Sequence, residues 1–257
     1  MAKLTRTQFI SALAPTAIRL RQEGSPLLPS VRLSQAILET GGVIHPWYNL
    51  GGIKVGNGAI NAYWQGEAVN KGTKEYINER TVETRAAFRA YRSVYHFYKD
   101  QDLLFANHRY LRVREARTPE EQARMLQASG YATDPSYAAK LIALMNQHRL
   151  QQFDRLAQPL TKPEKLREAT HVPVLYVGLV AAAGYLLNGT TWVAARRLGE
   201  SLGAEVDWTG SKVLINGQEL ETILSEATGY VTARELAQVL GLRIEWDGEA
   251  RAVLMWK

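Results

Sequence analysis

The sequence predicts an α+β protein with a mostly helical first part and a small second domain. Helical apolar spacing covers most of residues 5–45 and 95–156, and a stretch rich in Gly and Asn at 46–84 separates them. The last third of the chain repeats a pattern of strand, helix and strand. With 257 residues, 46% of them hydrophobic, the chain has room for two ordinary domains with a sizeable core.

The N-terminal segment is predicted to be the first helix of the folded domain. Phe9, Leu13, Ala17 and Leu20 are spaced to lie on one helix face. A signal peptide is the alternative, since the start is basic and an apolar stretch follows. Pro15 interrupts that stretch and no clear cleavage site follows it. We therefore expect a protein made in the cytoplasm that does not use ordinary signal-peptide export.

Residues 46–84 are expected to form loops and short strands beside the helical body, a small β-lobe. Helices return after residue 95. In "TPEEQARML", Thr118 can cap a helix that has Pro119 at its first position. In "TDPSYAAKLIALMNQH", Asp134 is the expected cap and Pro135 lies in the first turn.

The chain is expected to contain a domain over 1–157, a Pro-rich charged linker over 158–171 and a second domain over 172–257. In the second domain, residues 190–210 align with 228–248 at an offset of 38. Each repeat is typical of a short strand, an amphipathic helix ended by Gly, and a strand–turn–strand.

Trp208 and Trp246 occupy equivalent positions in these repeats, and we expect both to pack in the core. Residues 172–195 carry no charge and are long enough to span a membrane. They include Pro173 and three glycines, however, so buried strands are expected in place of a membrane span.

Charge is uneven along the chain. Residues 1–160 hold 21 Lys and Arg against 13 Asp and Glu, whereas residues 161–257 hold 10 against 12. A basic first part suits an anionic partner, although an ordinary solvated basic surface is an equal alternative. The chain has no cysteine, and its five histidines show no metal-ligand spacing, so we expect neither a metal nor a cofactor.

Glu39 is the only acid in "LSQAILETGG", residues 33–42. It follows an apolar run, and two glycines come soon after it. A carboxyl group near apolar side chains has a raised pKa and can donate a proton, as the general acid of a glycosidase must. The alternative is a Glu that only caps or pairs at a helix end.

Five motifs occur in order along the first domain: "LSQAILETGG", "YNLGGIK", "GTKEY", "AAFRAYRS" and "GYATDPSYAAKL". Over about residues 5–156 the chain resembles the glucosaminidases of glycoside hydrolase family 73, which include flagellar rod-cap muralytic enzymes and many autolysins. The resemblance implies a lysozyme-like fold, with a helical lobe and a β-lobe around a groove. It also implies cleavage of the β-1,4 bond after N-acetylglucosamine in peptidoglycan.

The resemblance assigns catalytic roles. Glu39 matches the general acid, and Glu75 in "TKEY" matches a second acid that is either a base for water or an electrostatic partner. Glu79 and Glu83 are alternatives for that second acid, and assistance by the N-acetyl group of the sugar would make it less critical. Tyr131 matches a tyrosine at the cleavage point, although it would also suit a packed aromatic position.

The chain departs from the family pattern near the acid. Thr40-Gly41-Gly42-Val43 stands where the family often has Ser-Gly-Trp-Gly, and Gly51 replaces a phenylalanine. Other aromatic side chains must then provide the sugar-binding surface. The expected substrate-binding residues are Trp47, Tyr48, Asn49, Lys54 and Trp64.

The C-terminal repeats resemble the stalk-type domain named after the N-terminal domain of copper amine oxidases. The sequence has no His or Cys cluster for copper, so the resemblance implies a non-catalytic module that holds the enzyme on its substrate. Dimerisation or stabilisation is the alternative.

The expected function is hydrolysis of bacterial peptidoglycan by a phage or prophage endolysin that acts on the wall after release. The expected partners are glycan strands and anionic wall polymers, without nucleic acid; a basic aromatic run, "FRAYRSVYHFYKD", is the weak argument for nucleic acid. A muramidase or lytic transglycosylase on the same fold is the first alternative. A wall-binding protein with a decayed site is the second.

Overall fold

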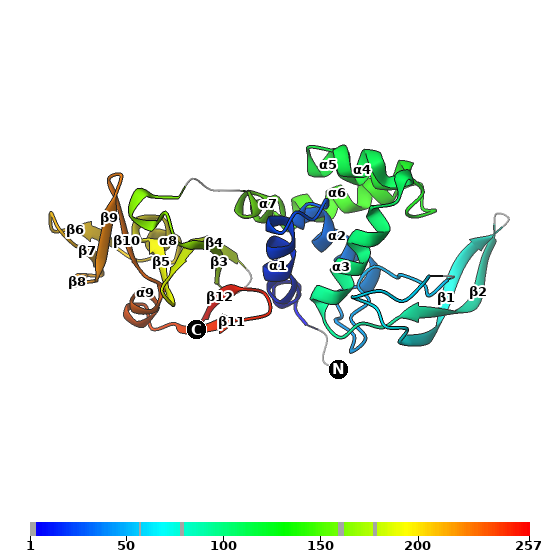
Figure 1. Ribbon diagram of the computed structural model, residues 1–257, viewed down its shortest axis with the longest axis horizontal. Helices are drawn as coiled ribbons and strands as arrows, with labels where there is room; N and C mark the ends of the chain where they lie inside the picture. Colours follow the sequence, from blue (N-terminus) through cyan, green and yellow to red (C-terminus); the bar gives the residue numbers. More distant parts are fainter. Residues whose placement is uncertain (1–3, 57, 78–79, 159–161, 177–178) are drawn as a thin grey trace. The chain divides into compact units, whose positions relative to one another are not determined.

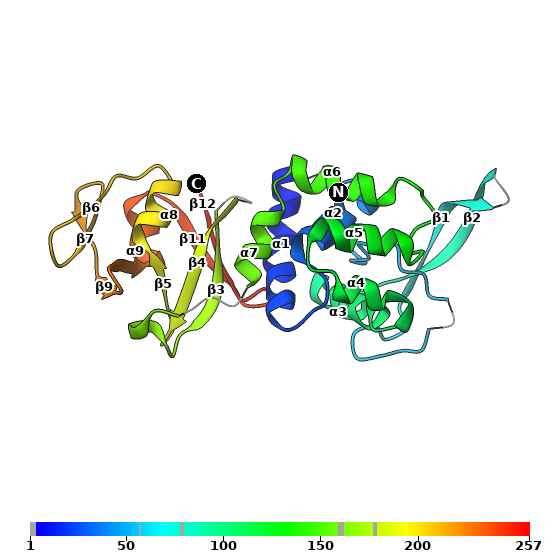
Figure 2. The same ribbon diagram turned by 90° about the horizontal axis from the view of Figure 1, so that it is seen from above.

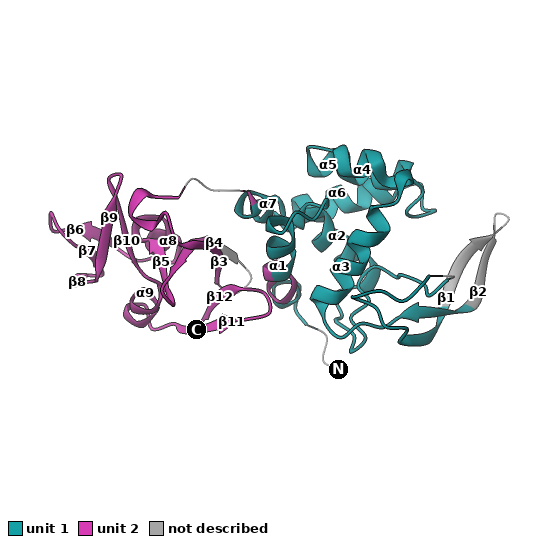
Figure 3. Cartoon of the chain, in the orientation of Figure 1, with its two compact units in different colours: residues 1–9, 16–157 teal, residues 10–15, 158–257 magenta. Residues whose placement is uncertain are grey.

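The computed structural model describes residues 4–56, 58–77, 80–158, 162–176 and 179–257, with the backbone alone described at 73–77, 80–84 and 179–181. The chain divides into two compact units (Figure 3). Unit 1 contains residues 1–9 and 16–157, and unit 2 contains residues 10–15 and 158–257.

Helices dominate unit 1 (Figure 1). They are α1 (Arg6–Gln22), α2 (Pro29–Thr40), α3 (Val94–Phe105), a 3-10 turn (His108–Tyr110), α4 (Leu111–Glu115), α5 (Pro119–Ala128), α6 (Tyr137–Gln147) and α7 (Gln151–Ala157). Helix α2 packs against α5, α6 and α7, which surround it in Figures 1 and 2. This central helix carries Glu39.

The prediction of a first helix is confirmed. Thr5 and Gln8 form a capping box at its start, with the Gln8 N–H donating to Thr5 Oγ1 at 3.2 Å. The predicted apolar face is fully buried: Phe9, Leu13, Ala17 and Leu20.

Helix α5 begins as predicted, because Thr118 Oγ1 accepts a hydrogen bond from the Glu121 N–H at 3.1 Å. The predicted start of α6 is wrong by two residues. Asp134 accepts from the Ser136 N–H at 2.8 Å, and Ser136 is the residue that precedes the helix. The short Asp side chain bonds the backbone two residues on, which forms a turn before the helix in place of a cap on it.

The small β-lobe is also confirmed. Strand β1 (Ala68–Ile77) pairs antiparallel with β2 (Arg80–Arg89), from Ala68 opposite Arg89 to Ile77 opposite Arg80. The loop before β1 is tied to β2, since the Arg89 N–H donates to the Ile53 carbonyl oxygen at 3.0 Å. Figure 1 shows the two strands beside the helices of unit 1.

The basic aromatic run at 88–100 forms packing in unit 1. Tyr91, Phe97 and Tyr98 are each at most 5% exposed. The Arg89 guanidinium pairs with the Asp100 carboxylate at 2.9 Å. These aromatic rings therefore offer no surface on which nucleic-acid bases could stack.

Unit 2 is built mainly from short strands. They are β3 (Thr170–Tyr176), β4 (Leu179–Leu187), β5 (Thr190–Ala194), β6 (Val206–Trp208), β7 (Val213–Ile215), β8 (Gln218–Glu219), β9 (Thr222–Ser225), β10 (Thr228–Thr232), β11 (Arg243–Asp247) and β12 (Ala252–Trp256). One sheet has the order β11-β12-β3-β4-β5-β10-β9, and the other has β6-β7-β8. The helices are α8 (Ala195–Ser201) and α9 (Ala233–Val239), with a 3-10 turn at Glu164–Leu166.

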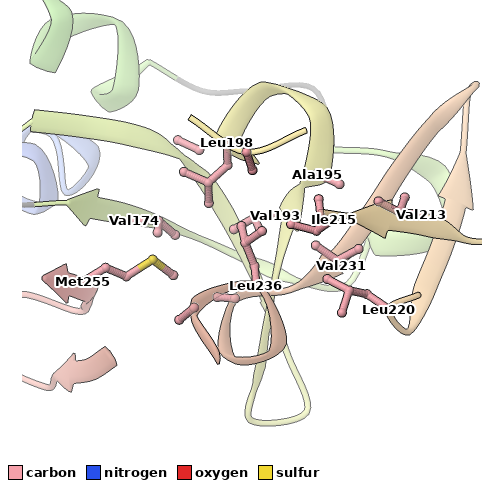
Figure 4. Close-up of a cluster of buried hydrophobic side chains, with 14 of the residues drawn as sticks. Val174, Val193, Ala195, Leu198, Val213, Ile215, Leu220, Val231, Leu236 and Met255 are labelled. Carbon is pink, nitrogen blue, oxygen red and sulfur yellow. The ribbon is translucent and has the colours of Figure 1, made fainter. Parts of the chain in front are cut away.

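The predicted repeat is visible in the fold. Strand β5, helix α8 and hairpin β6–β7 form the first copy, and β10, α9 and β11–β12 form the second. The equivalent residues Val193 and Val231 face each other as register partners between antiparallel β5 and β10. Each helix packs on the strand of the other copy. Figure 4 shows both valines in the shared apolar core with Leu198 and Leu236.

The expected burial of Trp208 and Trp246 is wrong. Their exposed fractions are 41% and 43%. Trp208 lies on β6 and Trp246 on β11, and each of these strands is at an edge of its sheet. A side chain on an edge strand has a neighbouring strand on only one side, so both rings stay accessible.

The uncharged stretch at 172–195 forms β3, β4 and β5, as expected for buried strands. None of the helices described here has the length and apolar character needed to cross a bilayer. Leu166 and Ala169, which the sequence-based division places in the linker, are buried in unit 2 against Tyr185, Trp192 and Tyr230.

Candidate active site

Glu39 lies in the last turn of α2. Gly41 ends the helix in the left-handed conformation, with φ of 63°, and its N–H donates to the Ile37 carbonyl oxygen at 3.1 Å. Gly42 follows with φ of 92°. Residues with a Cβ are strained at these angles, so the two glycines let the chain turn away directly after the acid.

The other end of α2 is fixed by a buried carboxylate. Asp154 of α7 accepts hydrogen bonds from the Ser30 N–H at 2.8 Å and the Ser30 hydroxyl at 2.7 Å. Ser30 is the second residue of α2, so Asp154 supplies the cap that Leu28, at the N-cap position, lacks. This contact fixes the N-terminal end of α2, the helix that carries Glu39, to α7.

A cavity of 370 Å³ opens in front of the Glu39 carboxyl group. The cavity is lined by Glu39, Thr40, His45, Trp47, Asn49, Gly52, Lys71, Gly72 and Phe88. The Glu39 side chain is accessible from the cavity, yet the surrounding protein removes part of its hydration. This desolvation raises the pKa of Glu39 above 4.5, and a hydrogen bond from Tyr137 partly opposes the effect.

A polar stripe runs along one face of α2 toward the cavity. Arg32, Gln35 and Glu39 are spaced three and four residues apart, so their side chains lie on the same face. Gln35 Nε2 donates to the Tyr137 hydroxyl at 3.1 Å, and that hydroxyl donates to Glu39 Oε1 at 3.4 Å. Burial raises the pKa of Tyr137 well above its usual value, so the hydroxyl remains a donor.

Tyr131 is held by a second chain of contacts from the same stripe. The fully buried Arg32 guanidinium pairs with the Asp102 carboxylate and donates to Gln101 Oε1 at 2.7 Å. Gln101 Nε2 donates to the Tyr131 hydroxyl at 3.4 Å, which donates to the Gly51 carbonyl oxygen at 3.3 Å. Burial and the nearby Glu39 both raise the pKa of Tyr131.

Gly51, where the resembled family has a phenylalanine, lies against this network. A Cβ at this position would lie 3.0 Å from the Tyr131 hydroxyl and 3.1 Å from the Phe97 ring. Real Cβ atoms rarely approach other atoms so closely. The space of the missing side chain is therefore occupied by Tyr131 and Phe97 in this chain.

Trp47 forms an aromatic wall of the cavity. Its ring stacks on His45 at 4.3 Å between centroids, with 5° between the planes. The Lys71 ammonium lies 5.0 Å from the same ring. Desolvation and the nearby Lys71 lower the pKa of His45, so the imidazole is neutral near pH 7. The indole is flat and partly exposed, and it lies beside an acid whose pKa is raised by desolvation.

The family model for mannosyl-glycoprotein endo-β-N-acetylglucosaminidase matches residues 14–150. The chain belongs to this glucosaminidase family. The matched range includes the acid on α2, the β-lobe and both tyrosines of the site.

Three curated relatives each match a little more than half of this chain. Peptidoglycan hydrolase FlgJ of Salmonella typhimurium is 36% identical over 148 residues, which are 54% of this chain and 45% of the relative. Exo-glucosaminidase LytG of Bacillus subtilis is 33% identical, with 58% and 53% covered. A probable N-acetylmuramidase of Lactococcus lactis subsp. lactis is 32% identical, with 57% and 34% covered. The chain thus spans about half or less of these relatives.

Among solved structures, a peptidoglycan hydrolase mutant from Sphingomonas sp. A1 is 35% identical to this chain, with a TM-score of 0.49. The match covers 57% of this chain and 97% of that structure.

Two of the residues predicted to bind substrate make contacts that stabilise the fold. Asn49 lines the cavity, but its amide donates to the Ile53 and Arg89 carbonyl oxygens at 2.8 and 2.9 Å. Trp64 is 3% exposed, and its Nε1 donates to the Glu67 carbonyl oxygen at 2.7 Å. The Arg89 guanidinium covers the Trp64 ring at 4.1 Å, so the ring has no free face for a sugar.

Tyr48 and Lys54 do not line the cavity. Tyr48 lies in a turn with φ of 48°, and Lys54 is an exposed residue whose backbone bridges to Phe88. Of the five predicted substrate-binding residues, Trp47 is therefore the one with a ring in the cavity wall.

The predicted second acid lies on the β-lobe. The Glu75 backbone is in β1, opposite Val82, and the Glu83 backbone is in β2, opposite Lys74. The side chains of both lie outside the described part of the structure, as does the whole of Glu79.

The sequence arguments missed several residues of the site. Gln35 and Arg32 are polar residues within an apolar helix, and their spacing from Glu39 could have identified them. Tyr137 lies in the "GYATDPSY" motif, six residues after the tyrosine that was selected. His45 and Lys71 had no signal in the sequence, because each becomes relevant only through its contact with Trp47.

Proposed function

We propose that this chain hydrolyses the β-1,4 glycosidic bond after N-acetylglucosamine in the peptidoglycan of the bacterial cell wall. One observation supports this most strongly: Glu39, an acid with a raised pKa, faces an open cavity beside an aromatic wall. Membership of the glucosaminidase family supplies the class of bond.

In the proposed reaction, protonated Glu39 gives its proton to the glycosidic oxygen as the bond between that oxygen and the anomeric carbon breaks. One water molecule supplies the hydroxyl group for the anomeric carbon, and its second proton restores the enzyme. Tyr137, oriented by Gln35, donates to the carboxylate that forms. This hydrogen bond stabilises the product state of the proton transfer.

The second carboxylate of the proposal is Glu75 on β1. If its carboxyl group lies far enough from Glu39 to hold a water molecule, it acts as a base and the reaction inverts the anomeric configuration. If the acetamido group of the sugar assists the reaction, Glu75 stabilises charge and its replacement has a smaller effect.

The basic composition of residues 1–160 supports an additional attraction to anionic wall polymers. Such attraction would concentrate the enzyme on its wall substrate and would weaken as salt is added. The interpretation as a phage or prophage endolysin stays a prediction.

A second candidate activity is cleavage of the other glycosidic bond, which would make the protein a muramidase. It is favoured by the Lactococcus lactis relative, which is named a probable N-acetylmuramidase. The same acid and cavity would serve either bond, so the sugar left at the new reducing end decides between the two.

The test is digestion of purified peptidoglycan by the wild-type protein and by Glu39→Gln. The products are reduced with borohydride and the new ends are identified by mass spectrometry. Reduced N-acetylglucosamine ends that disappear with Glu39→Gln are expected. Reduced muramic ends would establish the second candidate, and binding without any new ends would establish a wall-binding protein. The same digestion with Glu75→Gln measures the contribution of the second acid.

A further inference from the structure

Unit 2 contains a cavity that has no part in the site around Glu39. Its volume is 930 Å³, against 370 Å³ for the cavity at the acid. It is formed by β4, β5, α8, the β6–β7 hairpin and the turn between β9 and β10, all of unit 2. Ligand pockets commonly have volumes of about 300–1,000 Å³, so this cavity has room for a short oligomer.

The cavity lining combines a set of small residues, which we call the floor, with exposed aromatic and aliphatic side chains. Trp208 and Leu224 are 41% and 43% exposed at the cavity, although both are large apolar side chains. The floor consists of small residues: Ala182, Ala183, Ala194, Ala195 and Gly229. An apolar floor with an accessible indole suits the flat face of a ligand that also carries small apolar groups.

Charged groups surround this floor in equal numbers of each sign. Arg196 pairs with Glu200 at 3.0 Å, which leaves Arg197 and Asp207 as one cation and one anion. Neither of their side chains has an ion-pair partner among the residues that the structure describes. A lining without net charge favours a neutral ligand rich in hydrogen-bonding groups over a polyanion.

The two copies of the repeat contribute differently to this cavity. Trp246 is the counterpart of Trp208, is equally exposed and does not line the cavity. Gly229 corresponds to Thr191 of the other copy. A Cβ on Gly229 would lie 2.6 Å from Val213 Cγ2, so only glycine lets the β6–β7 hairpin lie this close. The small residue in one copy therefore shapes the cavity wall that carries Trp208.

We propose that this cavity binds a segment of a neutral N-acetylated glycan, with Trp208 against a sugar ring. The acetyl methyl groups would lie on the alanine floor, and Arg197 and Asp207 would bond hydroxyl and amide groups. The choice of glycan rests on the proposed function, because the catalytic unit acts on the same polymer. A second binding site on one chain raises the local concentration of substrate at Glu39.

The test uses the full chain with Glu39→Gln, so that the probe is not cleaved, and a soluble β-1,4-linked tetramer of N-acetylglucosamine. Calorimetry is expected to detect a binding component that Trp208→Ala weakens by about tenfold or more. Trp246→Ala is the matched control, since it removes an equally exposed tryptophan from the equivalent strand, and it should leave binding unchanged. Arg197→Ala should weaken the same component as Trp208→Ala.

Equal tetramer binding by Trp208→Ala and its parent would overturn the proposal. So would binding to insoluble peptidoglycan that depends on Trp208 but is not competed by the tetramer, which would indicate a peptide or another wall component. Hydrolysis assays on variants that keep Glu39 distinguish a failure of this proposal from a failure of the proposed function. Trp208→Ala should keep its rate on the soluble tetramer and lose rate on insoluble wall. If no variant releases new ends but Trp208-dependent tetramer binding persists, only the proposed function fails.

Discussion

The interiors of the two units differ in chemistry. Among the residues that the structure describes, eleven buried polar or charged residues belong to unit 1 and two belong to unit 2. In unit 1 many of them lie on α2 or contact it, including Arg32, Gln35 and Gln101. The main core of unit 2 consists mostly of Val, Leu, Ile and Ala, many of them from the two copies of the repeat.

We interpret this difference as one between a core that positions the proposed acid, Glu39, and a core that only stabilises a fold. A buried polar group costs free energy unless it is hydrogen-bonded, so an interior rich in such groups needs a function that explains it. In unit 1 the two chains of contacts from α2 end at Tyr137 and Tyr131, beside Glu39. Unit 2 needs no such network, because its proposed ligand site lies on accessible residues.

The largest effect is expected from replacing Glu39 by Gln. Gln has the same shape but cannot give up a proton, so the rate of glycan cleavage should fall by about 10²–10⁴-fold. The rate of reducing-end release measures this directly. A loss of less than tenfold would mean that another acid donates the proton and that the polar interior of unit 1 does not position the general acid.

The same variant should be more stable than the wild type at neutral pH. Folding raises the pKa of Glu39, so the folded state resists ionisation and loses stability as pH rises through that pKa. Gln has no such loss. Thermal unfolding of both proteins should therefore show no difference below about pH 4 and an increasing advantage of Glu39→Gln as pH rises. An advantage independent of pH would contradict the assignment of the raised pKa to this site.

Replacing Arg32 by Met breaks the polar interior at its centre. Asp102 loses its cation and Gln101 loses its donor, so unit 1 should lose about 3–5 kcal/mol of stability. Hydrogen exchange resolved by peptide should place this loss in unit 1. The paired change Arg32→Met with Asp102→Leu should recover more than half of it, because no unpaired charge remains. A loss below about 1 kcal/mol in the single variant would show that the network contributes little to folding.

Replacing Leu198 by Ala tests the apolar interior of unit 2. Leu198 is fully buried in the core, so its truncation should cost about 2–5 kcal/mol through lost contacts and a residual cavity. The same hydrogen-exchange measurement should place this loss in unit 2. Hydrolysis of a soluble oligosaccharide should continue at the wild-type rate, since the site is built from unit 1 alone. Ile60→Ala, at a side chain 65% exposed, is the control with little expected change.

Local signals were enough to predict much of the fold. The buried face of α1 and the Thr118 cap depend on residues a few positions apart, and so does the repeat pattern. The acid was predicted for the same reason, since Glu39 and the glycines that end its helix are neighbours in the sequence.

Long-range contacts explain what the sequence could not predict. Arg32 meets Gln101 across 69 residues, and Gln35 meets Tyr137 across 102, so neither pair leaves a local pattern. Aromatic residues were the least predictable. Trp64 was expected at the substrate and is buried, whereas Trp208 was expected in the core and is exposed. Residue type sets a preference for burial, but the neighbouring strands decide the outcome.

The smallest effect is expected within unit 2, where its two copies differ in one turn. The β4–β5 turn is Asn188-Gly189, with φ of 49° and 79°, whereas the β9–β10 turn is Glu226-Ala227, with φ of 50° and 60°. Asn and Gly tolerate this left-handed conformation better than Glu and Ala. Glu226→Asn with Ala227→Gly should therefore stabilise unit 2 by about 1 kcal/mol.

Unfolding in urea, monitored by hydrogen exchange in peptides of unit 2, measures this gain in the free energy of unfolding. The reverse exchange, Asn188→Glu with Gly189→Ala, should lower stability by a similar amount. Unequal results would show that the turns do more than connect strands. In particular, a stabilised β9–β10 turn that also weakens tetramer binding would indicate that Ala227, which lines the unit 2 cavity, contributes its methyl group to the ligand. The strain in that turn would then belong to the proposed binding site.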